Sequence, residues 1–394
     1  MGKNAIVFIG MTYPHGIIRH FAYLAVELNK VLADKEDVDF YFASTDGETN
    51  QNAWPMIRDN FVSERIICEH KFEKLADRIC ILGKEYEKVL VHTGGGFGQT
   101  KQLVLARRRM NKLVSERLRI ILAGTTHSFR NDSIHRIWMS ALQCALYLLF
   151  YKKIIFQCQD AADAFVGSSL LFKAGKGVIV PLGCEGFVEP SPDVPTAIRE
   201  KGLGDMLADK SLFKMVYLAQ FRPGKMHAWL VKALIPIFKQ HVEARLILCG
   251  MGNEVVVNDV KEIIKENGLE SQVVIPGQIP RYEVPWLLKH VNCALVPSRA
   301  ETFGHNFLEP MFAGLPVVGT RVGIGKEIIE DGKTGYGFSL RHPEEIGEAI
   351  AKMIRDPELA RQMGGHAYAR VSTTYRHSDV AKRLAEVYRG MLEG

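Results

Sequence analysis

The chain has 394 residues, of which 47% are hydrophobic and 24% are charged. This composition is typical of a soluble globular protein long enough for two domains of about 150–200 residues each, and it excludes a disordered or collagen-like chain. Fifty basic and 44 acidic residues leave a net charge of +6, and segment 100–119, with seven basic residues and one acidic residue, carries an equal excess. We therefore expect a local basic patch on an otherwise neutral protein.

Seven scattered cysteines, an odd number without a C-x-x-C pair, argue against a disulfide framework or a zinc site. They favour a reducing, cytoplasmic compartment. At the start of the chain, the apolar residues 5–11 predict a first β-strand rather than a signal peptide.

Short apolar runs rich in Val and Ile alternate with helical patterns, as expected of parallel strands whose crossover helices cover both faces. Two such series predict an α/β protein with two doubly wound, Rossmann-like domains. The first series of strands is expected at residues 5–9, 38–43, 88–92, 120–123, 153–156 and 177–180. The second series is expected at residues 214–219, 245–249, 273–275, 293–296 and 316–319.

A stretch with three prolines between residues 188 and 195 separates the two series. We expect an N-terminal domain over residues 1–190, a linker over 191–211 and a C-terminal domain over 212–375. Residues 376–394 carry a helical pattern with no following strand, so we expect a final helix that packs back towards the N-terminal domain.

In open α/β sheets, ligands bind beyond the carboxyl ends of the strands. The first such loop, residues 10–19, brings Gly16 to the start of a helix expected over 17–30, where backbone N–H groups could face an anion. Its glycines do not form a G-x-G-x-x-G pattern, so a plain strand–helix turn fits this loop equally well.

The strongest pattern is segment 297–320, PSRAETFGHNFLEPMFAGLPVVGT. A loop with Glu301 and Gly304 follows a strand, and the next helix is expected to begin near Asn306 with Glu309 and Pro310 in its first turn. Helix-start N–H groups can hold a diphosphate, and the two carboxylates can accept hydrogen bonds from vicinal hydroxyls. As an alternative, Glu301 is a surface charge and Glu309 a partner of the helix dipole.

This segment resembles the E-x7-E signature of glycosyltransferase family 4, whose members are retaining enzymes of the GT-B fold. The spacing from Glu301 to Glu309 fits, and so does the tail GLPVV at 314–318. Further motifs of the family look like LAQFRPGKM at 218–226, VPLGCEGF at 180–187 and EIIEDGKTG at 327–335. The resemblance covers essentially the whole chain and implies two Rossmann-like domains that face each other across a cleft.

The resemblance also implies residue roles. Glu309 would bind the ribose hydroxyls of the donor, Glu301 would hold the donor sugar, and Lys225 would neutralise the leaving diphosphate. A fixed cation and helix-end amides stabilise that charge more in the transition state than in the ground state. The donor-binding residues expected on this basis are Gly16, Gln220, Arg222, Lys225, Gly250, Phe303, Gly304, His305, Asn306 and Glu309.

Two residues depart from the family's pattern. Gln220 stands where the family has an arginine, and Met226 replaces the common glycine after the lysine. Arg222 has the same strand parity as Gln220, so it could supply the second cation if the strand persists that far.

In the first domain, TTHSF at 125–129 resembles a family loop whose histidine faces the donor sugar and the acceptor. We expect His127 to be catalytic, together with Glu301 and Lys225. His92, at another strand end before a glycine-rich loop, is the alternative.

A D-x-D sequence can hold a divalent metal, and Asp37-Val38-Asp39 matches it. These residues lie where a strand begins, at the wrong end of the sheet for a ligand. We therefore expect a solvated turn there and no metal requirement.

Segment 100–119 forms an amphipathic pattern in which Lys101, Arg108, Lys112 and Arg119 share one helical face. This face could contact anionic lipid headgroups, or it could simply be solvated. Residues 137–151 are mostly apolar but too few to span a bilayer, and we expect a largely buried helix there.

We therefore expect a metal-independent, retaining glycosyltransferase that uses a UDP- or GDP-type sugar donor and no further cofactor. Its acceptor would be a glycan, glycolipid or lipid-linked saccharide, and it would work in the cytoplasm or at the membrane surface. The alternatives are another GT-B activity, such as a sugar-nucleotide epimerase, and a nucleic-acid-binding protein that uses segment 100–119. The neutrality of the other residues and the absence of a known binding motif argue against nucleic acid.

Overall fold

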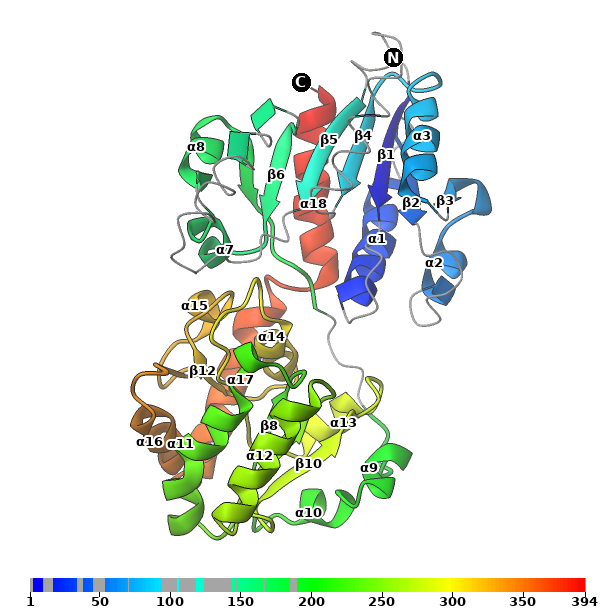
Figure 1. Cartoon of the computed structure of the whole chain (residues 1–394). Helices are drawn as coiled ribbons and strands as arrows, with labels where there is room; N and C mark the ends of the chain where they lie inside the picture. Colours follow the sequence, from blue (N-terminus) through cyan, green and yellow to red (C-terminus); the bar gives the residue numbers. More distant parts are fainter. Residues whose placement is uncertain are drawn as a thin grey trace. The chain divides into compact units, whose positions relative to one another are not determined.

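The computed structural model describes residues 3–9, 17–33, 38–44, 54–69, 71–93, 105, 118–123, 144–145, 148–149, 151–165, 167–184 and 190–393. The chain divides into two compact domains, one made of Met1–Gly183 and Tyr375–Gly394 and the other of Cys184–Thr374. Each domain has a parallel β-sheet with helices packed on it (Figure 1). The predicted α/β class with two Rossmann-like domains is therefore confirmed.

The sheet of the first domain is wholly parallel in its described part. Its strands are β1 (Asn4–Ile9), β2 (Val38–Ser44), β3 (Ile66–Cys68), β4 (Val89–Thr93), β5 (Leu118–Ala123), β6 (Lys153–Phe156) and β7 (Gly177–Ile179). They lie in the order β3-β2-β1-β4-β5-β6-β7. Edge strand β3 was not predicted, because three residues are too few for a periodic signal.

Segment 100–119 is not a helix at its end, because Leu118 and Arg119 belong to β5. The predicted basic helical face therefore does not include Arg119. Of residues 100–117, only Leu105 is among the described residues. Segment 137–151 is described only in part: Cys144 is buried, whereas Leu149 is 74% exposed.

Helices α1 (Ile17–Ala33) and α18 (His377–Glu393) of the first domain pack against each other, although they come from opposite ends of the chain (Figure 1). Val380, Leu384 and Tyr388 recur every four residues on the buried face of α18. The Lys88 ammonium also donates to the Leu392 carbonyl. The other helices described here are α2 (Trp54–Asn60), a 3-10 turn (Ser63–Arg65), α3 (Phe72–Leu82), α7 (Gln159–Asp163) and α8 (Ser168–Lys173).

The second domain has a parallel six-stranded sheet made of β8 (Phe213–Leu218), β9 (Ala244–Cys249), β10 (Val273–Gly277), β11 (Cys293–Val296), β12 (Val317–Thr320) and β13 (Gly335–Phe338). The strand order is β10-β9-β8-β11-β12-β13. Strand β13 was not predicted, since its sequence GYGF lacks the apolar run of the others.

Crossover helices cover the second sheet, as Figure 1 shows for α11 and α12. The helices are α9 (Thr196–Glu200), α10 (Gly204–Ala208), α11 (His227–Gln240), α12 (Glu254–Glu266), α13 (Val284–Lys289), α14 (His305–Phe312), α15 (Gly325–Ile328), α16 (Glu344–Arg355) and α17 (Pro357–Ser372). A 3-10 turn, Pro223–Lys225, precedes α11. None of the helices in the described part of the chain has the length and apolar character needed to cross a bilayer.

The expected linker 191–211 is instead part of the second domain, which begins at Cys184. The segment forms α9 and α10, whose Ile198 and Leu207 are buried. The ammonium of Lys214 at the start of β8 donates to the carbonyls of Leu207 (2.9 Å) and Asp209 (2.6 Å). Apolar anchors and these hydrogen bonds hold the segment to the sheet despite its prolines.

Candidate functional site

The loop between β11 and α14 turns sharply at Gly304. This residue has φ 104°, a left-handed conformation that favours glycine. A side chain there would also collide with the protein, because a Cβ would lie 2.8 Å from the Phe307 ring. Gly304 is the N-cap of α14, and having no side chain it cannot cap the helix itself.

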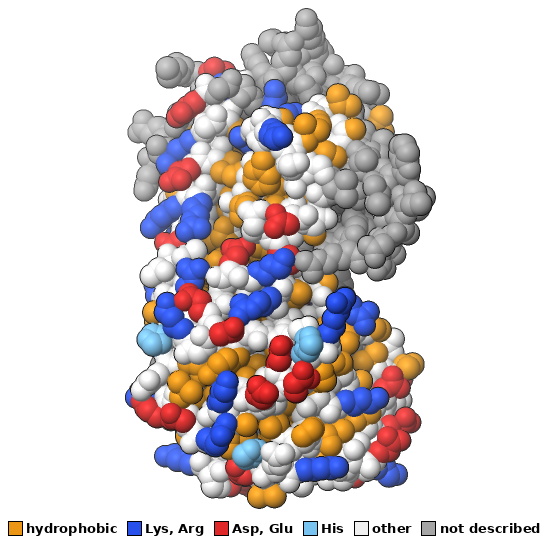
Figure 2. Space-filling model, turned by 90° about the vertical axis from the view of Figure 1, so that its left-hand side faces the viewer, with side chains coloured by type: hydrophobic (Ala, Val, Ile, Leu, Met, Phe, Trp, Pro, Cys, Tyr) orange, Lys and Arg blue, Asp and Glu red, His pale blue; other side chains and the backbone are white. Residues whose placement is uncertain are grey.

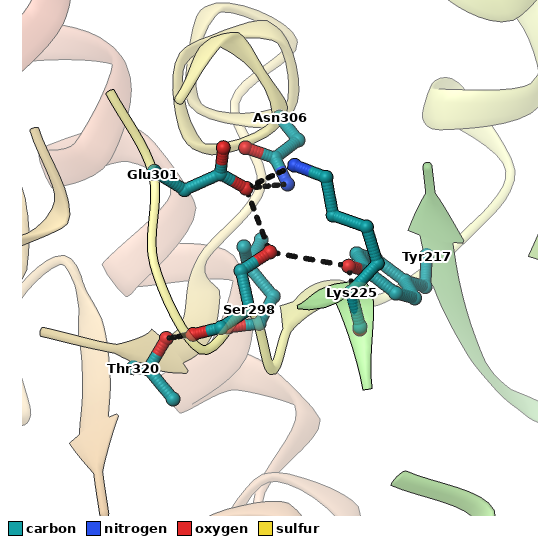
Figure 3. A network of polar contacts seen from close by, with 7 residues as sticks. Tyr217, Lys225, Ser298, Glu301, Asn306 and Thr320 are labelled. Carbon is teal, nitrogen blue, oxygen red and sulfur yellow. Dashed lines mark hydrogen bonds and ion pairs between the residues drawn. The ribbon is translucent and has the colours of Figure 1, made fainter. Parts of the chain in front are cut away.

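The carboxylate of Glu301 gathers three side chains in front of this helix start (Figure 3). Its Oε1 is paired with the Lys225 ammonium, accepts a 2.6 Å hydrogen bond from Ser298 Oγ, and accepts a 3.2 Å bond from Asn306 Nδ2. The Glu301 side chain is 10% exposed and that of Lys225 is 25% exposed. Three predicted site residues thus meet in one partly open cluster.

Tyr217 and Ser298 support this cluster from below (Figure 3). The Tyr217 hydroxyl, at the end of β8, donates to the Lys225 carbonyl (3.0 Å) and lies 3.3 Å from Ser298 Oγ. Burial raises the pKa of Tyr217 well above its usual value, so the hydroxyl stays neutral and can donate. Thr320 Oγ1 in turn donates to the Ser298 carbonyl at 2.6 Å. The sequence analysis singled out neither Tyr217 nor Ser298, although Ser298 lies within segment 297–320.

Lys225 lies in a strained turn. Met226, directly after it, has φ 60° and is the one non-glycine residue with positive φ in the described part of the chain. Glycine takes this left-handed conformation at little cost, so a glycine would relieve the strain at this position. The Gly224 carbonyl accepts a 2.9 Å hydrogen bond from the Arg299 N–H, which ties the turn to the Glu301 loop.

The predicted donor-binding residues Gln220 and Arg222 lie beyond the assigned end of the strand. Strand β8 ends at Leu218, and beyond it only Phe221 forms an isolated bridge, with Gly252. The Ala219 and Phe221 N–H groups still donate to the Cys249 and Met251 carbonyls at 3.0 Å, so the role of Arg222 as a substitute for the arginine of the resembling family stays a prediction. Arg222 is exposed, and its carbonyl accepts the Lys225 N–H at 2.9 Å.

Gly250 has a packing reason to be glycine. A Cβ on it would lie 2.0 Å from the Ala219 carbonyl oxygen, because the loops after β8 and β9 approach closely here. Phe303 is also engaged by the protein: its carbonyl accepts the Ile324 N–H at 2.7 Å, and its ring meets that of His305 edge-on at 5.3 Å.

Glu309 does not lie in the first turn of α14, contrary to the prediction. The helix begins at His305, so Glu309 is its fifth residue and Pro310 its sixth, in the second turn rather than the first. Pro310 therefore removes a hydrogen bond that its position would otherwise make to the Asn306 carbonyl. The Glu309 carboxylate is paired with the guanidinium of Arg281, a residue that the sequence did not single out.

In the first domain, Gly16 and His127 lie outside the described residues. The alternative, His92, is sealed in the core: it is 2% exposed, its Nδ1 lies 2.5 Å from the Tyr388 hydroxyl, and its ring packs 4.7 Å from Phe8. Burial lowers the pKa of His92 to about 3. This histidine holds α18 to the sheet and cannot meet a substrate.

Asp39 is not part of a solvated turn. It lies within β2, is 7% exposed, and pairs with Arg65 at 2.5 Å and with Lys3 at 2.9 Å. The Tyr86 hydroxyl donates to its other oxygen at 2.7 Å. Three donors thus occupy this carboxylate. Among the described residues, no group of three or more His, Cys, Asp or Glu side chains could hold a metal.

Comparison with known proteins places this site within a recognised domain. Residues 204–370 match the family model of group 1 glycosyl transferases. N-acetyl-alpha-D-glucosaminyl L-malate synthase of Bacillus anthracis is 29% identical over 178 residues, which cover 45% of this chain and 45% of that protein. Alpha-1,3/1,6-mannosyltransferase ALG2 of Dictyostelium discoideum is 33% identical over 130 residues, 32% of this chain and 30% of that protein. The matched segments span less than half the length of these relatives.

Solved structures resemble the chain over its whole length. Anabaena HepE in complex with UDP and glucose has a TM-score of 0.73 at 17% identity and covers 98% of this chain and 99% of its own. A glycosyltransferase from Rickettsia africae has a TM-score of 0.74 at 18% identity, with 100% and 99% covered. At such identity the likeness concerns the fold, and the chain has the two-domain GT-B fold.

Proposed function

We propose that this protein is a retaining glycosyltransferase of family 4, which transfers a sugar from a nucleoside diphosphate sugar to a hydroxyl of a saccharide or glycolipid acceptor. The match to group 1 glycosyl transferases and the names of the sugar-transferring relatives support the activity. The HepE complex with UDP and glucose supports a nucleotide-sugar donor, and we propose a donor of UDP or GDP type.

The observation that carries the proposal is the Lys225–Glu301 pair at the start of α14 (Figure 3). A cation and a carboxylate lie together beside a helix start that has no side-chain cap, and neither side chain is fully buried. A diphosphate needs positive charge and N–H donors, whereas sugar hydroxyls need an acceptor, and this cluster offers both kinds of group.

In the proposed reaction, the bond between the anomeric carbon and the diphosphate oxygen breaks as the acceptor hydroxyl attacks from the same face. Negative charge grows on the departing diphosphate, where the Lys225 ammonium and the positive end of α14 stabilise it. The diphosphate takes the acceptor proton, so no enzymatic nucleophile is required. Glu301 accepts hydrogen bonds from the donor sugar, and Ser298 and Asn306 keep its carboxylate in place.

Because Lys225 supplies the positive charge in this scheme, we propose that the reaction needs no metal or further cofactor. Chelation with EDTA should then leave the rate of transfer unchanged. A loss of activity that manganese restores would contradict this part of the proposal.

We assign acceptor binding to the first domain, with His127 as its catalytic residue, and we place the protein in the cytoplasm. The basic residues of segment 100–119 before β5 would contact anionic lipid. On the face of the second domain in Figure 2, acidic, basic and hydrophobic side chains are interspersed, so this face offers no continuous basic surface for nucleic acid.

The test is a thermal-shift panel of nucleoside diphosphates and their sugars, followed by analysis of the products. A ligand at 100 times its dissociation constant should stabilise the protein by about 2.7 kcal/mol. Glu309→Ala should abolish the shift, and the product should keep the anomeric configuration of the donor. A protein that binds none of these ligands, or that converts the donor without any acceptor, would refute the proposal.

A further inference from the structure

The outer edge of the first sheet carries a surface made by the described residues of segment 148–153 and by residues 168–176, which we call the edge surface (Figure 1). The second of these segments comprises α8 and the loop that leads into β7. The Lys153 ammonium donates to the Gly175 carbonyl at 2.6 Å, and the Lys176 ammonium donates to two carbonyls of the first segment. Because these bonds join the two segments, the edge surface is continuous.

Three large apolar side chains of the edge surface are open to solvent. Leu149 is 74% exposed, Leu170 is 52% exposed and Phe172 is 37% exposed. The Phe172 ring stacks on the buried Phe156 ring, with 5.7 Å between the ring centroids, so packing against the sheet fixes it at the surface. Leu171, between the two exposed residues of α8, is buried and anchors the helix. Apolar groups gathered on a firmly held surface mark a site of contact with another molecule or phase.

The edge surface is also basic. It contains no aspartate or glutamate but four lysines, each within four residues of an exposed apolar side chain: Lys152, Lys153, Lys173 and Lys176. The hydrogen bonds of Lys153 and Lys176 go to carbonyl oxygens, which do not neutralise the ammonium charge. Partial burial and the nearby charge of Lys152 lower the pKa of Lys176. Like charges held this close together favour an anionic partner.

We propose that the edge surface docks this protein on a membrane that contains anionic lipid. The lysines would lie at the level of the lipid phosphates, and the exposed leucines and Phe172 would enter the boundary between headgroups and acyl chains. Nucleic acid would satisfy the charge but would offer no apolar phase to these side chains. The inference goes beyond the proposed function, because lipid binding requires neither donor nor acceptor, and it adds a contact to the one proposed for segment 100–119.

Charge and apolar insertion should contribute separately to the binding. In Figure 2, basic and hydrophobic side chains lie next to each other in the described part of the first domain. Each lysine near an anionic surface strengthens partitioning by about fivefold, and salt screens this attraction. Insertion of Leu149 and Leu170 together should add about tenfold or more, and salt does not screen that contribution.

The experiment measures sedimentation of the full-length protein with vesicles, without any sugar donor. One set of vesicles is phosphatidylcholine alone, and the other contains about one third phosphatidylglycerol. The variants are the charge reversal Lys152→Glu with Lys173→Glu, and the polar pair Leu149→Ser with Leu170→Ser, each checked for an unchanged thermal midpoint.

Matched controls come from the second domain. Lys239→Glu with Lys261→Glu reverses two exposed lysines of α11 and α12, and Val242→Ser removes an apolar side chain that is 78% exposed. Both controls should bind the vesicles as the wild type does.

We expect the wild type to bind the anionic vesicles and to lose most of this binding at high salt. The charge reversal should lower the partition coefficient by about 25-fold or more, and the serine pair by about tenfold or more. A wild type that does not sediment with anionic vesicles, or variants that sediment as well as it does, would overturn the proposal. Loss of binding in the lysine variant alone would also overturn it, because the surface would then attract polyanions without entering a membrane.

Discussion

Each domain holds a polar pair near the carboxyl end of a central strand, and the two pairs differ in their contact with solvent. His92 in β4 is 2% exposed and meets the Tyr388 hydroxyl of α18. Lys225 and Glu301, beyond the ends of β8 and β11, keep 25% and 10% of their side chains exposed. A sealed pair can only hold elements together, whereas a partly open pair can also exchange its partner for a ligand. Position at a strand end therefore does not by itself identify a functional residue.

Substitution of Lys225 or Glu301, the partly exposed pair of the second domain, should have the largest effect on activity. Glu301→Gln and Lys225→Ala should each lower the rate of sugar transfer by about 100–1,000-fold, because each removes a group that meets the charge or hydroxyls of the donor. Release of nucleoside diphosphate, measured with purified proteins, checks this. Lys239→Ala, an exposed lysine in the last turn of α11, is the control and should keep full activity. A loss of less than about tenfold in both variants would make this pair structural, like that of the first domain.

Substitution in the buried pair, His92 and Tyr388, should lower stability without lowering activity. Tyr388→Phe leaves the buried His92 Nδ1 without its hydroxyl partner, so we expect the free energy of unfolding to fall by about 1–3 kcal/mol. The rate of transfer per folded molecule should not change. Tyr336→Phe is the control. It also removes a tyrosine hydroxyl, but it keeps the aromatic ring that contacts the Lys352 ammonium. Urea unfolding and the transfer assay on the same samples distinguish the two effects, and a Tyr388→Phe variant that is stable but slow would contradict the comparison.

A pH titration sharpens the same contrast. The pKa of His92 is lowered to about 3 in the folded protein by burial, whereas in the unfolded chain it is about 6.5. Between these values the unfolded state binds more protons, so the free energy of unfolding should fall as the pH drops below 6.5, by about 1–2 kcal/mol between pH 7 and pH 5. Urea unfolding of wild type and His92→Gln at both pH values measures this. If His92→Gln loses as much stability as the wild type, His92 is not the group responsible.

The smallest effect concerns the turn that carries Lys225. Met226 has φ 60°, so Met226→Gly should relieve the strain and raise the free energy of unfolding by up to about 1 kcal/mol, partly offset by the greater freedom of glycine in the unfolded chain. Met226→Ala keeps the strain and loses the side chain, so it should be less stable than Met226→Gly. Thermal unfolding of the two variants compares them, and an Ala variant at least as stable as the Gly variant would argue against strain at this position.

The candidate site was predictable where its residues lie close together in sequence. Glu301, Gly304 and Asn306 occupy a single loop and helix start, and Lys225 belongs to a second short motif. Prediction failed where a helix boundary mattered: placing the start near Asn306 put Glu309 in the first turn, although the helix begins at His305 and Glu309 is its fifth residue. It also failed for Arg281 and Ser298, whose importance arises from side chains that lie beside them only in the folded chain.

By itself the sequence determined the alternation of strands and helices in both domains and the residues of the central motif, because apolar periodicity and glycine positions are local properties of the chain. The tertiary structure decided which polar groups meet: Arg281 with Glu309 across 28 residues, and His92 with Tyr388 across 296. It also decided that segment 191–211 belongs to the second domain, since the burial of Ile198 and Leu207 and the Glu283 contact to α9 depend on neighbours distant in sequence. Burial and partnership are set by strand order and packing, which no local pattern encodes.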